Sequence, residues 1–317
     1  MARRELGPAA LAVAQAVERM VRGVDRFVVG CSGGPDSLAL ALASRWASRR
    51  CRSDVRVVIV DHRLQQGSDD VAERTRQLLA SRGMDARVRR VDVDAEDPDG
   101  PEAAARTARR AALLDVAGDE PVLLGHTLDD QAEQVLLSLA RGSGATSLAG
   151  IRPRSGQFWH PLLEIRRAQT VQACREWEVE PWQDPHNGDP RFLRSRVRTE
   201  LMPVMAEVLG PGVAESLARS AALLAGEDQV VARAARVWAD EHGVSSDELS
   251  GLCGVEAGLA RRVVKEWLPE ASMVHVDSVL GLLEGPGGAG VDVPGGRVEV
   301  RRGTLYLTRR LGRHMSR

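Results

Sequence analysis

Short apolar runs alternate with longer stretches of helical periodicity through the first half of the chain. Residues 27–29, 55–60 and 121–125 are apolar runs of strand length, and residues 87–93 form a further, shorter candidate strand. Helical spacing of apolar residues covers residues 11–21, 68–83 and 102–116, between or before these runs. Strands that alternate with helices in this way predict an α/β fold built on a doubly wound parallel sheet.

From residue 210 onward the pattern changes to long helical segments followed by a strand-like tail. Residues 230–238, 252–268 and 274–283 have helical spacing, whereas residues 290–294, 298–300 and 304–307 resemble strands. A chain of 317 residues is long enough for two domains. We therefore expect a first domain at 1–210 and a smaller C-terminal α+β domain at 211–317.

Small and polar residues gather directly after the first predicted strand, where residues 27–37 read FVVGCSGGPDS. A strand, a glycine turn and a helix N-terminus form an anion site, because first-turn N–H groups lack helical partners. Glycines let the backbone approach phosphate oxygens, and an aspartate beside phosphates suits a bridging Mg²⁺ ion. The candidate phosphate-binding residues are Ser32, Gly33, Gly34, Pro35, Asp36 and Ser37.

This turn differs from the common nucleotide-binding loops. A Walker A loop requires Gly-x-x-x-x-Gly-Lys-Ser/Thr, and Lys265 is the only lysine in the chain. The dinucleotide pattern Gly-x-Gly-x-x-Gly is also absent from this turn. The alternative interpretation is an ordinary strand–helix turn capped by Asp or Ser.

Polar residues also follow two other predicted strands. Asp61 and His62 end the second strand, and His126 ends the fourth, at the sheet edge where parallel sheets bind ligands. For His62, a loop histidine that caps the next helix is an equally good interpretation. Asp130 and Glu133 lie three residues apart in the helix after His126 and so share a face. Acids in a first turn also complement the helix dipole, which is the alternative for this pair.

A cluster of positive charge occupies residues 191–198, which contain four arginines and one phenylalanine. Phosphate contact is the natural function of such a segment, and a solvated helix face is the alternative. The four arginines are Arg191, Arg194, Arg196 and Arg198.

Composition mainly excludes some classes of protein. The net charge is −1, so a nucleic-acid partner has to be argued from local patches. No apolar run is long enough to span a bilayer and the start lacks a signal-peptide core, so we expect a cytoplasmic protein without a membrane partner. The four cysteines are far apart, which gives no support for a zinc, iron–sulfur or paired redox site. The oligomeric state stays open, with a homodimer as one option.

Taken in order, the motifs resemble those of the tRNA(Ile)-lysidine synthetases, a family of PP-loop ATP pyrophosphatases. The matching segments read SGGPDS, VDHRLQ, EAAARTARR, GHTLDDQAEQVLLSLARGSGATSLAGI, HPLL, WQDPHN and RFLRSRVR, between residues 27 and 203. The resemblance implies that free lysine is joined to position 2 of the wobble cytidine of isoleucine tRNA, which has the anticodon CAU. It also implies that ATP with Mg²⁺ adenylates the cytidine and is converted to AMP and pyrophosphate.

The resemblance also implies roles for particular residues. The phosphate loop would hold the pyrophosphate, with Asp36 helping to place Mg²⁺, and Asp61, His62 and His126 would lie at the nucleotide. Arg106 occupies the position of the family's catalytic arginine, which would stabilise charge on the cytosine oxygen. The remaining roles are lysine binding for Asp130 and Glu133, and contact with the cytidine and its phosphate for Arg194 and Arg198.

The chain departs from the family pattern at three positions. Thr127 stands where many members have a second histidine, Gln134 where threonine is common, and Ser195 where asparagine is common. By the same resemblance the C-terminal domain would contact tRNA outside the anticodon, and unchanged tRNA affinity after its deletion would contradict that role.

Two other classes of function remain open from the sequence. One is another PP-loop enzyme, either a tRNA thiolase, which would normally have paired or catalytic cysteines, or an amide-forming synthetase, which would need a glutaminase partner. The other is a tRNA- or nucleotide-binding protein without catalysis, which would bind its ligands without releasing pyrophosphate.

Overall fold

A computed structural model describes the protein over residues 6–63, 67–93, 100–183, 191–285 and 288–309. The chain forms two compact units, Met1–Leu139 with Gly150–Ala221, and Ala140–Ala149 with Ala222–Arg317. This division differs from the boundary at 210/211 because the first turns of helix α10 (Val213–His242) pack within the first unit. There Ala214 is buried against Leu128 and Ala132. Within the second unit, Thr146 donates a hydrogen bond of 2.7 Å to Asp228.

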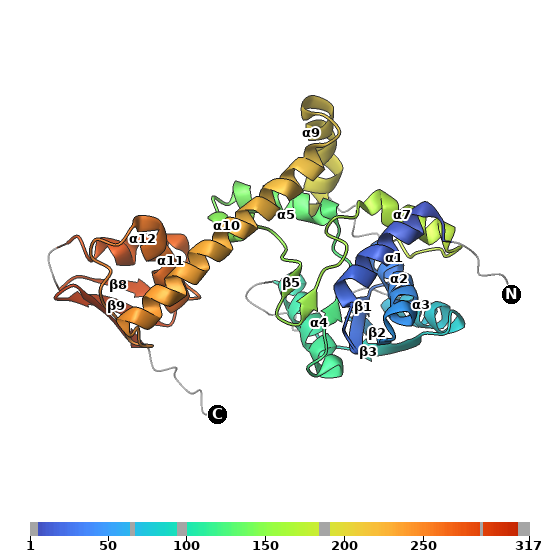
Figure 1. Ribbon diagram of the computed structural model, residues 1–317, viewed down its shortest axis with the longest axis horizontal. Coiled ribbons are helices and arrows are strands. Elements are labelled where there is room, and N and C mark those ends of the chain that lie inside the picture. The colour runs from blue at the N-terminus through green and yellow to red at the C-terminus, as the bar shows by residue number, and fades with distance from the viewer. Residues whose placement is uncertain (1–5, 64–66, 94–99, 184–190, 286–287, 310–317) are drawn as a thin grey trace. The chain divides into compact units, whose positions relative to one another are not determined.

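The first unit contains the predicted parallel sheet (Figure 1). Within the described residues, six strands pair in the order β3-β2-β1-β4-β6-β5, all parallel except β5, which is antiparallel to β6. The doubly wound α/β prediction is thereby confirmed, although the two-residue strands β5 and β6 are too short to show a period in the sequence. The strands are β1 Arg26–Cys31, β2 Asp54–Asp61, β3 Asp85–Arg90, β4 Val122–Leu123, β5 Arg154–Ser155 and β6 Phe158–Trp159.

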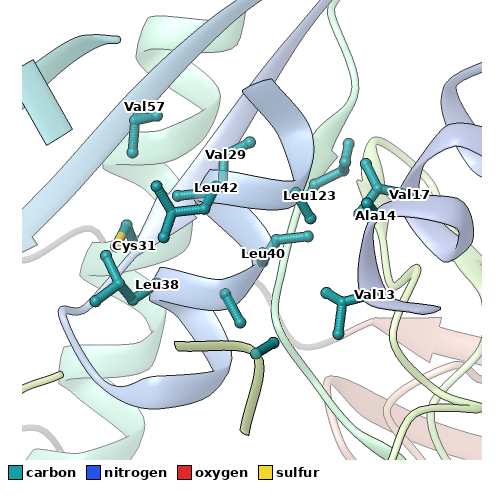
Figure 2. Packing of buried hydrophobic residues seen from close by; sticks show 14 of the residues in the cluster. Val13, Ala14, Val17, Val29, Cys31, Leu38, Leu40, Leu42, Val57 and Leu123 are labelled. Atoms are coloured by element: carbon teal, nitrogen blue, oxygen red, sulfur yellow. The ribbon is translucent and has the colours of Figure 1, made fainter. Parts of the chain in front are cut away.

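Alternate residues of the central strands pack against helices on opposite faces of the sheet. Phe27 and Val29 of β1 belong to a cluster with α1, α2 and α7, and Figure 2 shows part of this layer. Val28 belongs to a second cluster, with Leu113 of α4. The helices are α1 Pro8–Val21, α2 Pro35–Cys51, α3 Ser68–Ser81, α4 Pro101–Ala117, α5 Leu128–Ala140, α7 Arg167–Glu176, α8 Leu193–Arg196, the π-helix Val197–Leu201 and α9 Met202–Leu209.

The order of the strands reverses at the centre of this sheet, which creates a topological switch point. After β1, the chain adds β2 and β3 on one side and then crosses to β4 on the other side of β1. The loops after β1 and β4 therefore leave adjacent strands in opposite directions, which opens the crevice where such sheets bind ligands. Both the predicted phosphate loop and His126 lie at this crevice.

Ser68 is of a residue type that commonly caps helices, but it does not cap α3. The residue that caps α3 is Gly67, which has a φ of 81°, and Ser68 is the first helical residue. The Ser68 hydroxyl instead donates a hydrogen bond of 2.6 Å to Asp61 at the end of β2.

The second unit is the predicted α+β region. Its antiparallel sheet has the order β7-β10-β9-β8, and its helices pack on one core that includes Val264 and Leu305. None of the described helices is both long enough and apolar enough to cross a membrane. The elements are α6 Ala145–Leu148, α11 Ala257–Trp267, α12 Met273–Gly281, β7 Glu248–Leu249, β8 Gly290–Val293, β9 Gly296–Arg301 and β10 Thr304–Arg309.

Candidate functional site

The loop between β1 and α2 is folded around the side chain of Ser37. Its hydroxyl accepts a hydrogen bond of 3.0 Å from the Ser32 amide and donates one of 3.1 Å to the Gly34 carbonyl. Gly33 has a φ of 84°, a left-handed conformation that favours glycine. Gly34 caps α2 and Pro35 is its first residue, so the loop leads directly to a helix N-terminus. This arrangement has the features of a backbone anion site.

A cavity of about 490 Å³ opens beside this loop. One part of its wall is apolar and comes from Val58, Val60, Leu113 and Leu124, whereas the rest is polar. The predicted site residues that line the cavity are Ser32, Gly34, Pro35, Asp36, Ser37, His62, His126, Asp130 and Arg198.

Other predicted residues lie outside this wall. Gly33 faces a separate cavity near Trp182, whose amide donates a 3.0 Å hydrogen bond to the Gly33 carbonyl. Asp61 is 2% exposed and supports its own loop by accepting a bond from the Arg63 amide. Arg106 is exposed on α4, and Arg109, one turn later, lines the cavity in its place. Arg191, Arg194 and Arg196 do not line it, and residues 64–65 and 184–187 of the quoted motifs are outside the described residues.

Gly125, two residues after β4, lies close to the backbone of the phosphate loop. A Cβ atom at this position would lie 3.0 Å from the backbone carbonyl of Asp36 and 3.2 Å from the Cα of Ser37. Because both contacts are to backbone atoms, the loop itself would have to move.

We expect Gly125→Ala to reduce ATP-dependent turnover by roughly threefold to tenfold, because the backbone has to shift by a few tenths of an ångström and a full 1 Å misplacement costs on the order of 10²-fold. The measurement is the rate of pyrophosphate release at saturating ATP. Gly226→Ala is the matched control, since no atom lies within 4 Å of a Cβ at that position. Equal rates for both variants would show that the close approach at Gly125 has no functional consequence.

Three carboxylates bind a single arginine, Arg167, which lines this cavity. The Arg167 guanidinium donates to Asp36 at 3.2 Å through Nε, to Glu133 at 3.1 Å through Nη1, and to Asp130 at 2.7 Å through Nη2. Glu133 is only 1% exposed. A buried carboxylate needs such partners, because an unpaired buried charge costs several kcal/mol.

A second arginine, Arg198, binds the same acids from the other side. Its Nε and Nη2 donate to the two oxygens of Glu133 at 2.7 and 2.9 Å, and Nη2 also lies 3.3 Å from Asp130. Arg194 is held by Gln134 at 2.7 Å and lies 3.8 Å from Glu133. The predicted pair Asp130 and Glu133 therefore does share one face, which lies toward arginines from three other elements, α7, α8 and the π-helix.

The first turn of α7 holds both oxygens of Asp36. Arg167 takes Oδ2, and the Thr170 hydroxyl, one turn later, donates to Oδ1. The turn is itself anchored by Asp129, which accepts a bond of 2.7 Å from the Arg167 amide and one of 3.1 Å from Arg166. Asp129 thus serves the fold of the site, whereas its neighbour Asp130 faces the cavity.

Neither Arg167 nor Thr170 was singled out from the sequence. The available signal was their spacing of three residues, directly after the HPLL motif, at the start of a helix. Their partner Asp36 lies more than 130 residues earlier in the chain, so no local pattern links them.

Comparison with known proteins identifies the family. A family model described as the PP-loop domain matches residues 9–205. A tRNA(Ile)-lysidine synthase of Cutibacterium acnes (strain DSM 16379 / KPA171202) is 90% identical over 311 residues, which cover 98% of this chain and 100% of that protein. The chain belongs to the tRNA(Ile)-lysidine synthase family. The resemblance inferred from the motifs is thereby confirmed.

More distant members of the tRNA(Ile)-lysidine synthase family match over most of the chain as well. The synthase of Thermobifida fusca (strain YX) is 43% identical, covering 92% of this chain and 94% of its own length. That of Mycobacterium bovis (strain ATCC BAA-935 / AF2122/97) is 50% identical, covering 77% of this chain and 75% of its own length.

Among solved structures, the U34-tRNA thiolase NcsA from Methanococcus maripaludis, with its [4Fe-4S] cluster, matches with a TM-score of 0.57. The identity is 18%, over 68% of this chain and 80% of that chain, so the likeness concerns the fold alone. The described part of this family member contains no group of three or more His, Cys, Asp or Glu residues able to hold a metal ion. Its cysteines include buried Cys31 and Cys174 and exposed Cys253.

Burial and charge act in opposite directions on the acids of this family member. Burial raises the pKa of Asp36, and Arg167 and Thr170 offset only part of that effect. Burial acts on Asp130 in the same sense, but Arg167 and the Thr127 amide outweigh it and lower the pKa of Asp130. Thr127 donates both its amide and its hydroxyl to Asp130 Oδ2, each at 2.8 Å. This threonine therefore orients Asp130.

Burial lowers the pKa of three histidines in or next to the cavity, which favours their neutral form. Burial, together with the neighbouring His160, lowers the pKa of His126 to about 3, and the two rings lie 4.9 Å apart. Burial also lowers the pKa of His160 and of His62. The Nδ1 atoms of His62 and His126 are buried without a hydrogen-bond partner among the described residues. Two polar atoms are thus available to a ligand in the cavity.

The lowered pKa of His126 predicts that the folded protein becomes less stable in acid. Between pH 6.5 and 3 the unfolded chain binds a proton at His126 and the folded chain does not, so stability falls as pH falls in that window. We expect a loss of about 1–2 kcal/mol in the free energy of unfolding between pH 6.5 and 5, at 1.4 kcal/mol per pH unit for one proton. Urea unfolding at both pH values measures it. His126→Gln should lose less, and an equal loss in both proteins would contradict the assignment.

Proposed function

We propose that this chain uses ATP to ligate free lysine to position 2 of the wobble cytidine of isoleucine tRNA with the anticodon CAU, and that it releases AMP and pyrophosphate. The observation that supports this proposal is that Arg167 binds Asp36 in the phosphate loop and the acid pair Asp130 and Glu133 at the same time. A site for a triphosphate and a site for an ammonium group then adjoin each other, as a ligation of this kind requires.

The cavity beside the phosphate loop suits ATP. The loop and the N-terminus of α2 offer backbone donors to phosphate oxygens, and the apolar wall of Val58, Val60, Leu113 and Leu124 suits the adenine ring. The unpartnered Nδ1 atoms of His62 and His126 supply polar contacts in the same cavity.

Asp36 is the residue that would hold Mg²⁺. Mg²⁺ in such sites keeps several waters and takes one or two carboxylates together with phosphate oxygens, so a single aspartate beside the loop fits. When bound, the ion supplies positive charge to the polyphosphate. Asp36 is already oriented for this by Arg167 and Thr170.

A second cavity, which Glu133 of the acid pair lines, suits lysine. Arg167 and Arg198 also line this cavity of about 250 Å³, whose remaining wall includes Met202 and Ala206. An apolar wall next to a carboxylate suits an aliphatic chain that ends in an ammonium group. Lysine has an unperturbed side-chain pKa of about 10.4, so its amine must lose a proton before it attacks, and Asp130 or Glu133 can accept that proton.

The arginines would act on the cytidine and its tRNA. Cytosine is a poor electrophile at position 2 until its oxygen is adenylated, and a fixed positive charge stabilises the negative charge that develops there. Arg106 and Arg194 are proposed for this role, and Arg191, Arg196 and Arg198 for phosphate contact in the splayed anticodon loop. The second unit, with exposed Arg297, Arg301 and Arg309, is proposed as a further tRNA contact.

One assay separates the proposal from the alternatives. The protein is incubated with an isoleucine tRNA transcript, ATP, Mg²⁺ and labelled lysine, and both tRNA-bound label and pyrophosphate are measured. Lysine incorporation with one pyrophosphate per lysine supports the proposal. Pyrophosphate release without incorporation would indicate a different PP-loop enzyme, and tRNA binding without either product would indicate a binding protein.

A further inference from the structure

Arg167 makes three contacts at three different places in the site. Its Nε goes to Asp36 in the phosphate loop, whereas Nη1 and Nη2 go to Glu133 and Asp130 on α5. Each nitrogen of the guanidinium thus serves a different acid. The side chain also lines both cavities, that of about 490 Å³ beside the loop and that of about 250 Å³ beyond Glu133.

The acid pair has little capacity left for an incoming ammonium group. Asp130 Oδ2 accepts from Thr127, and Oδ1 accepts from Arg167 and Arg198. Glu133 Oε1 accepts from both arginines, and Oε2 accepts from Arg198. Glu133 Oε2 accepts only one of these bonds, with Arg194 Nε 3.8 Å away, so a cationic substrate that is to bind both acids must displace a guanidinium nitrogen.

Arg167 is the arginine whose release a nucleotide can favour. Of the two, it alone also bonds Asp36, next to the place where the phosphates would lie. A triphosphate adds several negative charges in that cavity, and a cation that competes for Asp36 would remove one of the arginine's three partners. The first change draws Arg167 away from Asp130 and Glu133, and the second frees its Nε to bind a phosphate oxygen.

We propose that Arg167 is a positioning residue that couples the nucleotide site and the lysine site. It occupies Asp130 and Glu133, the acids proposed to bind lysine, until a bound nucleotide draws it toward the phosphate loop. This inference rests on the proposed function. It predicts that a nucleotide increases the affinity for lysine, and by linkage that lysine increases the affinity for nucleotide to the same extent. A residue that only stabilised the fold would give no such coupling.

Calorimetric titration of lysine into the full chain tests the proposal, with and without Mg²⁺ and α,β-methylene ATP, which cannot be cleaved between its α- and β-phosphates. We expect the lysine Kd of the natural protein to fall about tenfold with the analogue, within the usual range of site-to-site coupling. Arg167→Gln should bind lysine more tightly than the natural protein when nucleotide is absent. Its Kd should then change by less than about twofold when the analogue is added.

The matched control is Arg166→Gln, on the same turn of α7. Its guanidinium pairs with Asp129 at 3.0 Å and with Glu215 at 2.6 Å, and it makes no described contact with the three acids. Arg166 also lines the cavity of about 250 Å³, so the control compares the coupling and not the absolute lysine affinity, and this variant should keep the tenfold coupling. Arg167→Lys provides a second test if Arg167→Gln unfolds, since one ammonium cannot reach all three acids and the coupling should fall by at least half.

Several results would overturn the proposal. These are an unchanged lysine Kd with the analogue in the natural protein, natural coupling in either Arg167 variant, or weaker lysine binding by Arg167→Gln in the absence of nucleotide. Lysine incorporation into tRNA is measured on the same natural preparation. Incorporation without coupling would remove this inference alone, whereas absence of both lysine binding and incorporation would remove the proposed function.

Discussion

Replacement of Asp36 by asparagine should almost abolish pyrophosphate formation. Asn has the same shape but no charge, so it cannot attract Mg²⁺ to the phosphates. It also leaves the Arg167 guanidinium without one of its three carboxylates. The expected loss is roughly 10²–10³-fold in kcat, the range found when one preorganised electrostatic contact at the reacting centre is removed.

The measurement is pyrophosphate release with tRNA and lysine at saturation. Asp69→Asn is the matched control: Asp36 and Asp69 are each the second residue of a helix that a glycine caps, but Asp69 is exposed. Its rate should equal that of the natural protein. Near-normal turnover by Asp36→Asn would show that this carboxylate does not place the metal.

The second large effect is expected at Asp130. Asp130→Asn should raise the KM for lysine by on the order of 10²-fold, since removing one charged partner of a buried hydrogen-bonded pair costs about 2–5 kcal/mol. The carboxylate is lost where it binds Arg167 and Arg198, both of which line the proposed lysine cavity. The KM for ATP should change by less than about threefold, because Asp36 and the loop are unaltered.

Initial rates at varied lysine and varied ATP give both constants. Asp69→Asn is again the control, because Asp69 also lies in the first turn of a helix but lines neither cavity. Both of its KM values should equal those of the natural protein. If Asp130→Asn raised both KM values equally, Asp130 would serve the metal and not lysine.

Local patterns in the chain predicted the features that depend on short-range physics. Buried strands such as β1 and β2 are recognisable in the sequence as largely apolar runs. The turn after β1 is recognisable because a backbone anion site needs the glycines that it contains. The shared face of Asp130 and Glu133 follows from their spacing in a helix. The motif order indicated the family before any contact was known.

Other features could not be predicted because they depend on contacts between distant segments. The two-residue strands β5 and β6 exist only because β4 pairs with β6. The division of the units at Ala221/Ala222 depends on the packing of α10 against α5. The exposed position of Arg106 and the cavity position of Arg109 depend on how α4 lies on the sheet.

By itself, then, the sequence determined the parallel sheet and the family, since the first follows from the residue types of short segments and the second from the order of short motifs. The tertiary structure alone decided which charges meet. Arg167 reaches Asp36 across 131 residues and two acids of α5 across more than 30. An ion pair depends on the distance between two charges in space, and only the folded chain brings these groups together.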